Sequence, residues 1–227
     1  MDERILRPVA HIYNDYKEKF GIPRQSGRAN SVRSKIIFEK EFKHPEALRG
    51  IDGFSHLWLL FDFSKAHKDE FSPTVRPPRL GGNTKVGVFA SRSPFRPNSI
   101  GLSVVKLEKV EKTSEGTILI VSGADLLNGT PIYDVKPYLP YADCIENAKG
   151  GYTESTPWQS LEVEFKEGVK EKIAPEKLQG LIEVLQEDPR PSYQDDERIY
   201  KMKFGEYDIF FQVEEQILTV LEVNRDS

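Results

Sequence analysis

Two arginines on a proline-containing segment are the residues with the clearest capacity for chemistry. Arg92 and Arg96 lie four residues apart within residues 92–98, a segment that contains two prolines and ends at Asn98. Because prolines restrict the backbone, the two arginines are expected to be preorganised. Arginines held in this way suit the recognition of a carboxylate or a phosphate. The alternative is a proline-rich loop whose arginines are solvated.

A second group of polar residues could bind a cation or accept a proton. Asp125 and Asp134 lie near turn residues, where each could bind a cationic ligand group or simply cap a turn. The candidates for a general base are Asp134, Tyr138 and His56. His56 lies in an apolar stretch, so a hydrogen-bonded core histidine is the alternative. Tyr138 suits stacking on a nucleic acid base as well as it suits the core.

Several common types of active site are excluded because the sequence lacks the motifs that mark them. The four histidines show neither HxH nor HExxH spacing, so no metal site is expected. The sequence has no GxSxG nucleophile elbow and no P-loop. No GxGxxG follows a predicted strand, so a nucleotide site of the Rossmann type is not expected either.

Charge is unevenly distributed along the 227 residues, whose formal net charge is −4. No Asp or Glu occurs between residues 71 and 107, whereas residues 162–227 hold 9 Lys and Arg against 17 Asp and Glu. A basic early part followed by an acidic tail favours local binding of an anion, with fully solvated charges as the alternative.

We expect a cytoplasmic protein with no membrane segment. The first residues carry charges and no apolar core of signal-peptide length, and the longest apolar runs are too short to span a bilayer. Cys144 is the one cysteine, which excludes an intrachain disulfide and favours a reducing compartment. Its side chain is expected to be buried as a small hydrophobe.

The first part of the chain is predicted to be mainly β. Short apolar and β-branched runs alternate with turn residues, which is typical of a barrel or a sandwich. Residues 73–78 contain three prolines and are predicted to form an extended loop, and Trp58 is predicted to lie in the core. Strands are expected at residues 11–13, 32–39, 54–61, 85–89, 100–110 and 117–122, with one helical turn at 45–48.

A smaller unit is predicted after residue 160. Four apolar residues within 175–186 recur at i, i+3, i+4 and i+7, which indicates an amphipathic helix. Strands are expected at residues 161–165, 199–204, 207–213 and 216–223. The sequence therefore predicts a small β-barrel domain at residues 1–160, followed by a small α+β domain at residues 161–227.

Three residue-dense blocks resemble the TrmO (YaeB-like, TsaA-like) family of tRNA methyltransferases. They are residues 52–61, residues 73–79 with 86–103, and residues 123–143; the likeness continues at 188–193. The resemblance implies a β-barrel enzyme, not a Rossmann one, that acts as a homodimer. It also implies methyl transfer from S-adenosylmethionine to N6 of threonylcarbamoyl-adenosine at position 37, in the anticodon loop of tRNA.

The resemblance also implies where the cofactor binds. Related sequences usually have a histidine after a Phe-x-Phe stretch, which is residues 61–63 here. Ser64 and Lys65 follow that stretch in this chain, so the cofactor would be contacted there by the backbone and not by an imidazole. Arg24 or Arg92 would suit the cofactor carboxylate, and Asp125 or Asp134 its ammonium group. The implied cofactor-binding residues are Pro23, Arg24, Gln25, Ser64, Lys65, Arg92, Leu102, Asp134 and Lys136.

Four residues are expected to contact the RNA substrate. One arginine of the 92–98 segment would read the carboxylate of the threonylcarbamoyl group, and Arg190 would touch the anticodon loop. Alternatively, Arg190 and Asp188 only fix a turn. The expected substrate-binding residues are Arg96, Asn98, Tyr138 and Arg190.

Two other functions stay open on the sequence alone. One is a barrel that binds tRNA or a nucleotide without catalysis, which the change at Ser64 and Lys65 favours. The other is a methyltransferase that acts on a different acceptor. Dependence of the reaction on tRNA and on the threonylcarbamoyl group would separate these alternatives from the main hypothesis.

Overall fold

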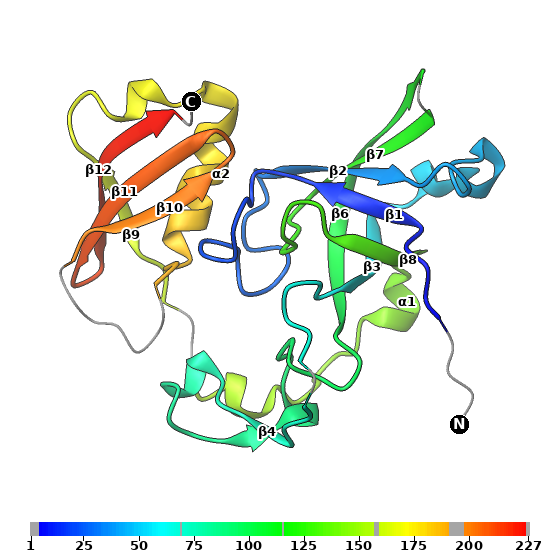
Figure 1. The fold of residues 1–227 in the computed structure, drawn as a ribbon, viewed down its shortest axis with the longest axis horizontal. Helices are drawn as coiled ribbons and strands as arrows, with labels where there is room; N and C mark the ends of the chain where they lie inside the picture. Colours follow the sequence, from blue (N-terminus) through cyan, green and yellow to red (C-terminus); the bar gives the residue numbers. More distant parts are fainter. Residues whose placement is uncertain (1–4, 69, 115, 157–158, 191–197, 226–227) are drawn as a thin grey trace.

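The chain folds into a barrel and a smaller sheet-and-helix unit that lie side by side (Figure 1). The computed structural model describes residues 5–68, 70–114, 116–156, 159–190 and 198–225. The predicted mainly β fold with a barrel is confirmed. None of the helices in these described ranges has the length and apolar character needed to cross a membrane.

Six antiparallel strands close the barrel in the order β1-β2-β7-β6-β3-β8. Side chains alternate across each strand, so that Leu57, Leu59 and Phe61 of β3 point into the core while their neighbours face outward. The barrel strands are β1 (Ala10–Tyr13), β2 (Arg33–Phe38), β3 (His56–Asp62), β6 (Ile100–Thr113), β7 (Gly116–Ser122) and β8 (Pro131–Pro137).

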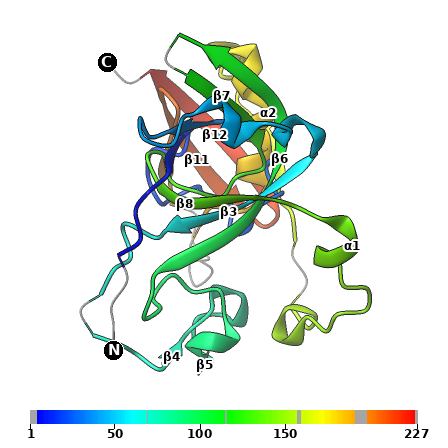
Figure 2. The same ribbon diagram turned by 90° about the vertical axis from the view of Figure 1, so that its right-hand side faces the viewer.

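A small two-stranded sheet lies away from the barrel strands (Figure 2). It pairs β4 (Thr74–Val75) with β5 (Val86–Gly87), so the prediction that residues 73–78 form only a loop is wrong. The ladder is possible because its two residues lie between Pro73 and Pro77, and no proline has to donate a hydrogen bond within it.

The expected strand at residues 85–89 is shorter than predicted. It ends at Gly87 because the chain turns into a 3-10 helix at Val88–Ala90, where only Val88 is buried. The predicted helical turn at 45–48 is confirmed as a 3-10 helix. The short helices of the first part are Pro45–Leu48, Ile51–Gly53, Pro78–Leu80, Val88–Ala90, α1 (Pro140–Asp143) and Gly151–Thr153.

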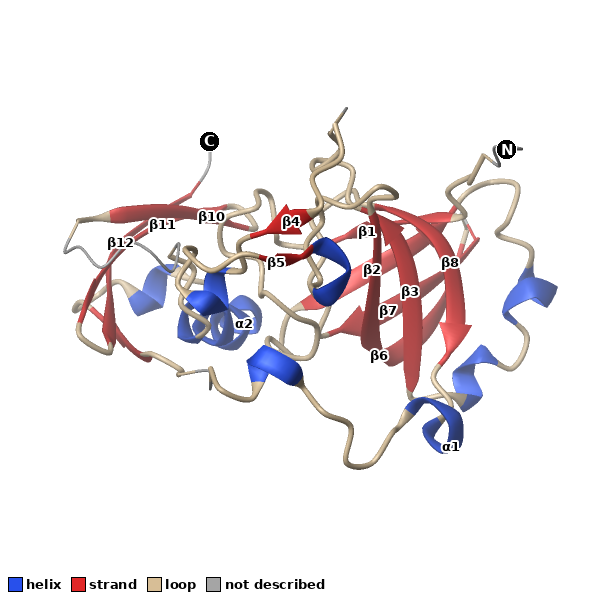
Figure 3. Ribbon diagram, turned by 90° about the horizontal axis from the view of Figure 1, so that it is seen from below, coloured by secondary structure: helices blue, strands red, loops and turns tan. Residues whose placement is uncertain are grey.

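The C-terminal unit is a four-stranded sheet packed against one helix, as Figure 3 shows. The strand order is β10-β11-β12-β9, with β9 parallel to β12. The predicted helix at 175–186 is confirmed, and it buries Leu181, Val184 and Leu185. The elements are β9 (Glu162–Phe165), a 3-10 helix at Lys170–Lys172, α2 (Pro175–Gln186), β10 (Tyr200–Phe204), β11 (Tyr207–Glu214) and β12 (Ile217–Arg225).

Residues 14–32 connect β1 to β2, and we call them the bridging loop. Tyr16, Ala29 and Val32 of this loop are buried in the same hydrophobic cluster as α2 and the C-terminal sheet. The barrel has a separate cluster of its own. An early segment of the chain therefore completes the core of the C-terminal unit, while a domain boundary at residue 160 stays a prediction.

Two predictions about individual side chains are wrong. Cys144 is exposed rather than buried, because it lies just after α1 in a stretch where every residue is exposed. Trp58 is only partly buried, because it lies on the outward-facing side of β3, where its Nε1 donates to Asp143 Oδ2 at 2.9 Å. Trp158 and residues 191–193 lie outside the described residues.

Candidate functional site

A large open cleft separates the arginine-rich part of the first unit from the end of α2. Its volume is about 1730 Å³, and it is lined by the β4 region, residues 89–97, residues 149–153 and part of the bridging loop. Two carboxylates, Glu70 and Glu187, also line it. The cationic lining residues are Arg24, Arg28, Lys68, Arg76, Arg79, Arg92, Arg96 and Lys149.

Aromatic side chains accompany these cations in the cleft lining. Phe89 is 74% exposed, and the Arg96 guanidinium lies 5.8 Å from the centre of its ring. The Lys68 ammonium lies 4.3 Å from the centre of the Phe95 ring. Phe89 and Arg76 were not among the site residues expected from the sequence. The acid-free stretch at residues 71–107 is the signal that contains both.

Residues 91–98, which we call the arginine loop, are held mainly by their own hydrogen bonds. Arg96 Nη1 donates to the backbone carbonyls of Ser91 at 2.8 Å and Val88 at 3.3 Å. Ser91 Oγ also donates to Val88 O at 2.9 Å. Arg96 thus fastens the loop on which Arg92 is carried, and Arg92 is the more exposed of the two arginines.

The arginine loop meets the bridging loop at Gln25. Arg92 Nη1 donates to Gln25 Oε1 at 2.6 Å. One residue earlier, Arg24 Nη2 donates to the carbonyl of Arg190 at 3.0 Å. Burial lowers the pKa of Arg24, against the raising effect of Asp188, and its guanidinium stays charged at neutral pH. Residues expected at the cofactor from distant parts of the sequence are therefore joined here.

A half-buried carboxyl group lies beside this junction. Asp125 Oδ1 accepts a hydrogen bond from Ser103 Oγ on β6 at 2.6 Å. Burial raises the pKa of Asp125, while the Ser103 hydrogen bond, the Arg92 charge and a backbone hydrogen bond from Ser26 act in the opposite direction. This arrangement brings one carboxyl group, Asp125, and one guanidinium group, Arg92, close to the bridging loop.

The turn after β3 contains Ser64 and Lys65, and it is held from three sides. Asp62 Oδ1 lies 2.7 Å from His67 Nε2 across the turn. The backbone nitrogen of residue 63 donates to Ser99 O at 2.8 Å, beside Asn98. The Lys65 carbonyl accepts from Lys19 Nζ of the bridging loop at 2.5 Å. The turn is thus tied to the bridging loop and to Ser99, the residue that follows the arginine loop, although position 64 is a serine and not a histidine.

Asp62 also connects this turn to β8. Burial raises the pKa of Tyr133, and the nearby Asp62 carboxylate, to which its hydroxyl is hydrogen-bonded, raises it further. Asp62 and Tyr133 are absent from the expected site residues. No sequence signal identifies them, because their proximity depends on the pairing of β3 with β8.

Leu102 and Asp134 lie level with each other on the outer face of the barrel. Both are register partners of Leu60, from β6 and β8 on its two sides. Leu102 is 54% exposed. Asp134 Oδ2 pairs with Lys136 Nζ at 2.8 Å, and Asp134 Oδ1 accepts from the nitrogen of Val135 at 2.9 Å. These three expected cofactor residues therefore share one surface.

His56 and Tyr138 lie at the opposite end of β3 from Ser64. Six strand steps separate His56 from Asp62, a distance of about 20 Å. His56 Nδ1 lies 2.9 Å from Ser55 Oγ, and the Tyr138 ring packs near His56 and Trp58 with centres 6.3 and 5.8 Å away. The expected site residues thus lie in four places: at the cleft, in the turn after β3, on the outer face of the barrel and at this far end.

Arg190 is nearly buried and pairs within its own turn. Its Nε and Nη2 donate to the two carboxylate oxygens of Asp188 at 2.9 and 3.0 Å. Asp188 has a positive φ of 47°. The geometry matches the alternative in which these two residues fix a turn. The Arg190 carbonyl of that turn accepts the hydrogen bond from Arg24.

The polar groups at the junction fit S-adenosylmethionine, which needs a cation for its carboxylate and an anion for its ammonium group. Arg92 is exposed in the cleft and Asp125 is its carboxylate neighbour. Within the described ranges, no cluster of three or more His, Cys, Asp or Glu side chains is arranged to hold a metal ion.

Comparison with known proteins identifies the family. Residues 11–144 match the model of the tRNA-methyltransferase O N-terminal domain, and residues 158–226 match that of the TrmO C-terminal domain. The chain is 42% identical over 199 residues to the tRNA (adenine(37)-N6)-methyltransferase of Escherichia coli K12, covering 85% of each chain. It is 38% identical over 228 residues, 96% of each chain, to a Pseudomonas aeruginosa protein named as an S-adenosylmethionine-dependent methyltransferase.

A solved structure agrees with these sequence matches. The crystal structure of TrmO from Pseudomonas aeruginosa superposes with a TM-score of 0.81 at 33% identity, covering 99% of this chain and 98% of that one. The resemblance inferred from the three sequence blocks is therefore confirmed over both units. The chain belongs to the TrmO family of tRNA methyltransferases.

Proposed function

We propose that this protein transfers a methyl group from S-adenosylmethionine to N6 of threonylcarbamoyl-adenosine at position 37 of tRNA. Membership of the TrmO family supports tRNA methylation at an adenine N6, since relatives carry that name. The single observation that carries the location is the junction of Arg92 with Gln25 at the edge of the arginine-lined cleft.

The cofactor is proposed to bind where the bridging loop, the arginine loop and the turn after β3 converge. Arg92 would hold its carboxylate and Asp125 its ammonium group. When bound, S-adenosylmethionine supplies the electrophilic methyl group. The remaining proposed contacts are Pro23, Arg24, Gln25, Ser64, Lys65, Leu102, Asp134 and Lys136.

The anticodon loop is proposed to enter the cleft. Its phosphates would be attracted by the cations that line the cleft, because these outnumber the two carboxylates there. Phe89 presents an exposed ring on which an unpaired base can stack. Asn98, Arg96 and Tyr138 remain proposed substrate contacts, with Arg96 acting partly through the loop that it fastens. The nearly buried Arg190 is proposed instead to fix the turn that holds Arg24.

Positioning is proposed to supply most of the rate. The substrate N6 is urea-like and weakly nucleophilic, so the reaction needs close, in-line approach and loss of the N6 proton. Among the three candidate bases, Asp134 lies level with Leu102 across β3, whereas His56 and Tyr138 lie toward the other end of that strand. We therefore propose Asp134 as the proton acceptor.

The test is nucleoside mass spectrometry after incubation of the purified protein with S-adenosylmethionine and tRNA. One tRNA preparation carries threonylcarbamoyl-adenosine and a matched one lacks that group. We expect a methyl-sized mass gain on the modified nucleoside in the first preparation only. An equal gain in both preparations, or methylation without tRNA, would point to a different acceptor. Cofactor binding without any methyl transfer would support a non-catalytic binding barrel.

We also propose that the protein acts as a homodimer in the cytoplasm. Ile100 and Leu102 are exposed apolar side chains next to each other on the outer side of β6, which suits a contact between copies. Light scattering coupled to size-exclusion chromatography should give twice the 26.0 kDa chain mass. A Leu102→Glu variant should shift that mass toward the monomer.

A further inference from the structure

We propose that the C-terminal unit positions the cofactor-binding loop, and that Glu183 on α2 is a positioning residue for S-adenosylmethionine binding. The proposal rests on the proposed function in one respect, namely that residues 23–25 of the bridging loop contact the cofactor. It assigns the C-terminal unit a role in cofactor affinity that is separate from any contact with RNA.

One stripe of α2 faces the bridging loop along most of its length. Lys177, Gly180 and Glu183, with Glu187 directly after the last helical residue, follow one another at spacings of three, three and four residues, so they lie on one side of the helix. Each member of this stripe meets a residue of the bridging loop. The bridging loop is therefore attached to this side of the helix at several points.

The central contact of the stripe is a paired hydrogen bond to Ser31. The Ser31 nitrogen donates to Glu183 Oε2 at 2.7 Å, and Ser31 Oγ donates to Glu183 Oε1 at 2.6 Å. Both contacts are partly buried, and hydrogen bonds to a charged carboxylate are stronger than neutral ones. Glu183 thus fixes the backbone and the side chain of the same loop residue.

Contacts on either side of Ser31 extend this attachment. Arg28 Nε donates to both carboxylate oxygens of Glu187 at 3.1 and 3.0 Å. At Gly180, an added Cβ would lie 3.0 Å from Val32 Cγ2, so the absence of a side chain permits the close approach of helix and loop.

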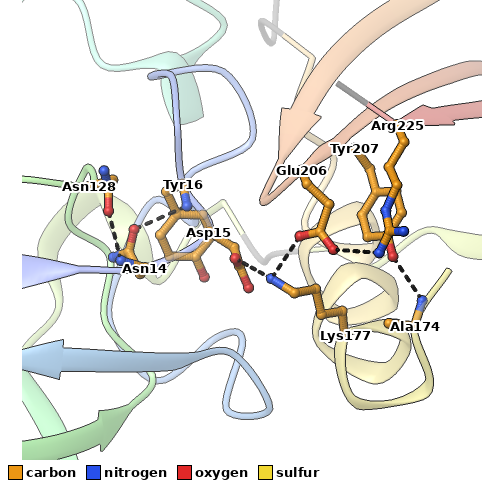
Figure 4. Close-up of polar contacts among 9 residues, drawn as sticks. All are labelled: Asn14, Asp15, Tyr16, Asn128, Ala174, Lys177, Glu206, Tyr207 and Arg225. Atoms are coloured by element: carbon orange, nitrogen blue, oxygen red, sulfur yellow. Dashed lines mark hydrogen bonds and ion pairs between the residues drawn. The ribbon is translucent and has the colours of Figure 1, made fainter. Parts of the chain in front are cut away.

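A second attachment holds the start of the loop. Lys177 Nζ lies 2.6 Å from Asp15 Oδ1 and 3.3 Å from Glu206 Oε2, and Figure 4 shows the ammonium group between the two carboxylates. The Asp15 carbonyl accepts from the nitrogen of Gly205 at 2.8 Å. Glu18 Oε1 accepts from the nitrogen of Lys203 at 2.8 Å. The loop is thus hydrogen-bonded to the β10–β11 hairpin as well as to α2.

Apolar packing holds the middle of the loop. The Phe20 ring stacks near Tyr200 and Phe211 of the C-terminal sheet, with both ring centres 6.3 Å away. Gly21 has a φ of 89°, and an added Cβ there would lie 2.2 Å from Met202 Sδ. The residues just before Pro23 are therefore packed directly on the second unit.

Displacement of the bridging loop would disturb two other segments proposed to bind the cofactor, namely the arginine loop and the turn after β3. Gln25 contacts Arg92, and Lys19 contacts the Lys65 carbonyl. Because small misplacements far from the reacting atoms can cost large factors in binding and rate, loosening the loop at Ser31 should weaken cofactor binding without removing any group that touches the cofactor.

The experiment compares Glu183→Ala with the matched control Glu176→Ala, which removes an exposed carboxylate from the same helix. Calorimetry gives the Kd for S-adenosylmethionine, and steady-state kinetics give KM for cofactor and tRNA separately. We expect Glu183→Ala to raise the Kd and KM for S-adenosylmethionine about tenfold. The KM for tRNA and the kcat at saturating cofactor should stay within about twofold of the wild-type values. Glu176→Ala should match the wild type throughout.

Two further variants protect the test against a simple folding defect. Ser31→Ala removes only the hydroxyl donor and should raise the cofactor Kd less than Glu183→Ala does. Glu183→Gln keeps one carbonyl acceptor and should restore part of the affinity. A normal cofactor Kd in Glu183→Ala, with or without weaker tRNA binding, would overturn the inference.

Failure of the proposed function would look different. Arg92→Ala removes a proposed cofactor contact that lies outside the helix stripe. Normal cofactor binding by Arg92→Ala would refute the proposed cofactor site, whatever Glu183→Ala does. Loss of binding in Arg92→Ala together with normal binding in Glu183→Ala would retain the site and refute only the positioning role.

Discussion

The arginine loop and the bridging loop meet at the hydrogen bond between Arg92 and Gln25, yet they are held in opposite ways. The arginine loop is fastened by Arg96 to carbonyls within eight residues of it. The bridging loop is fastened by side chains about 150 residues away, such as Glu183 on Ser31. The arginine loop should keep its conformation as long as its own residues are unchanged. The conformation of the bridging loop depends on the presence and the packing of the C-terminal unit.

The difference indicates a division of labour at the site. A locally held loop can present Arg92 at a fixed point, since its order requires no distant partner. A loop held by another unit can be shifted by anything that moves that unit. Changes in the C-terminal unit should therefore alter the affinity for the cofactor, whereas they should leave the position of Arg92 unchanged.

The largest effect is expected from Arg92→Ala. The loss of the proposed carboxylate contact should lower kcat/KM at least about 100-fold. The melting temperature should change by no more than about 2 °C, because the side chain is exposed. Methyl transfer assays and thermal unfolding measure the two quantities. A large fall in melting temperature would instead mean that this arginine mainly stabilises the fold.

The packing of the bridging loop is tested by two glycines. Gly21→Ala combines left-handed strain with overlap against Met202, and should lower the free energy of unfolding by about 3 kcal/mol. Gly27→Ala has a similar φ of 76° but nothing within 4 Å, so it should lose only about 1 kcal/mol. Urea unfolding compares the two, and equal losses would contradict the tight packing at Gly21.

A smaller effect is expected where the arginine loop is fastened. Arg96→Met keeps the length of the side chain but removes the donors to Ser91 and Val88, so kcat/KM should fall about tenfold. Arg96→Lys should be similarly impaired, since a lysine lacks the planar fork. Full activity in Arg96→Lys would show that charge, rather than fastening, is what the position supplies.

The smallest effect is a pH dependence at the Lys177 contact. Burial lowers the pKa of Lys177, but Asp15 and Glu206 more than offset it, so the net direction is upward. A raised pKa in the folded state gives a contribution that is fully present below the ordinary lysine value of about 10.4 and is lost as pH rises through the folded value.

Glu206 gives the acidic limit of the same contact. Burial raises its pKa, but its backbone hydrogen bond and Lys177 outweigh burial, so the net direction is downward. Its contribution is present above about pH 4.3 and is lost as pH falls through the folded value. The stability gap between the wild type and Lys177→Met, at most about 1 kcal/mol, should be constant from about pH 5 to 10. A gap that persists above about pH 12 would contradict the ionic origin.

Features that depend on local pattern were predictable from the sequence. The helix at 175–186 follows from apolar spacing, and the barrel strands follow from short apolar and β-branched runs between turn residues. The arginine loop follows from its own prolines and arginines. The short ladder at β4 escaped prediction because a proline-rich segment can still pair through the residues between its prolines.

Features that depend on packing between distant segments were not predictable. Nothing in residues 14–32 signals that their apolar side chains complete the core around α2. The separation of His56 and Tyr138 from the cleft follows from which end of β3 each occupies, and an apolar run does not reveal this. Glu183 reads as an ordinary exposed helix carboxylate until its partner on the bridging loop is known.

Hydrogen–deuterium exchange with and without S-adenosylmethionine tests the central claim most directly. If the cofactor binds where the two loops meet, exchange should slow together in residues 20–27 and 88–98, with little change at residues 54–58 and 138–142. Slowing confined to residues 54–58 and 138–142, with both loops unaffected, would place the cofactor at the far end of β3 and contradict the account.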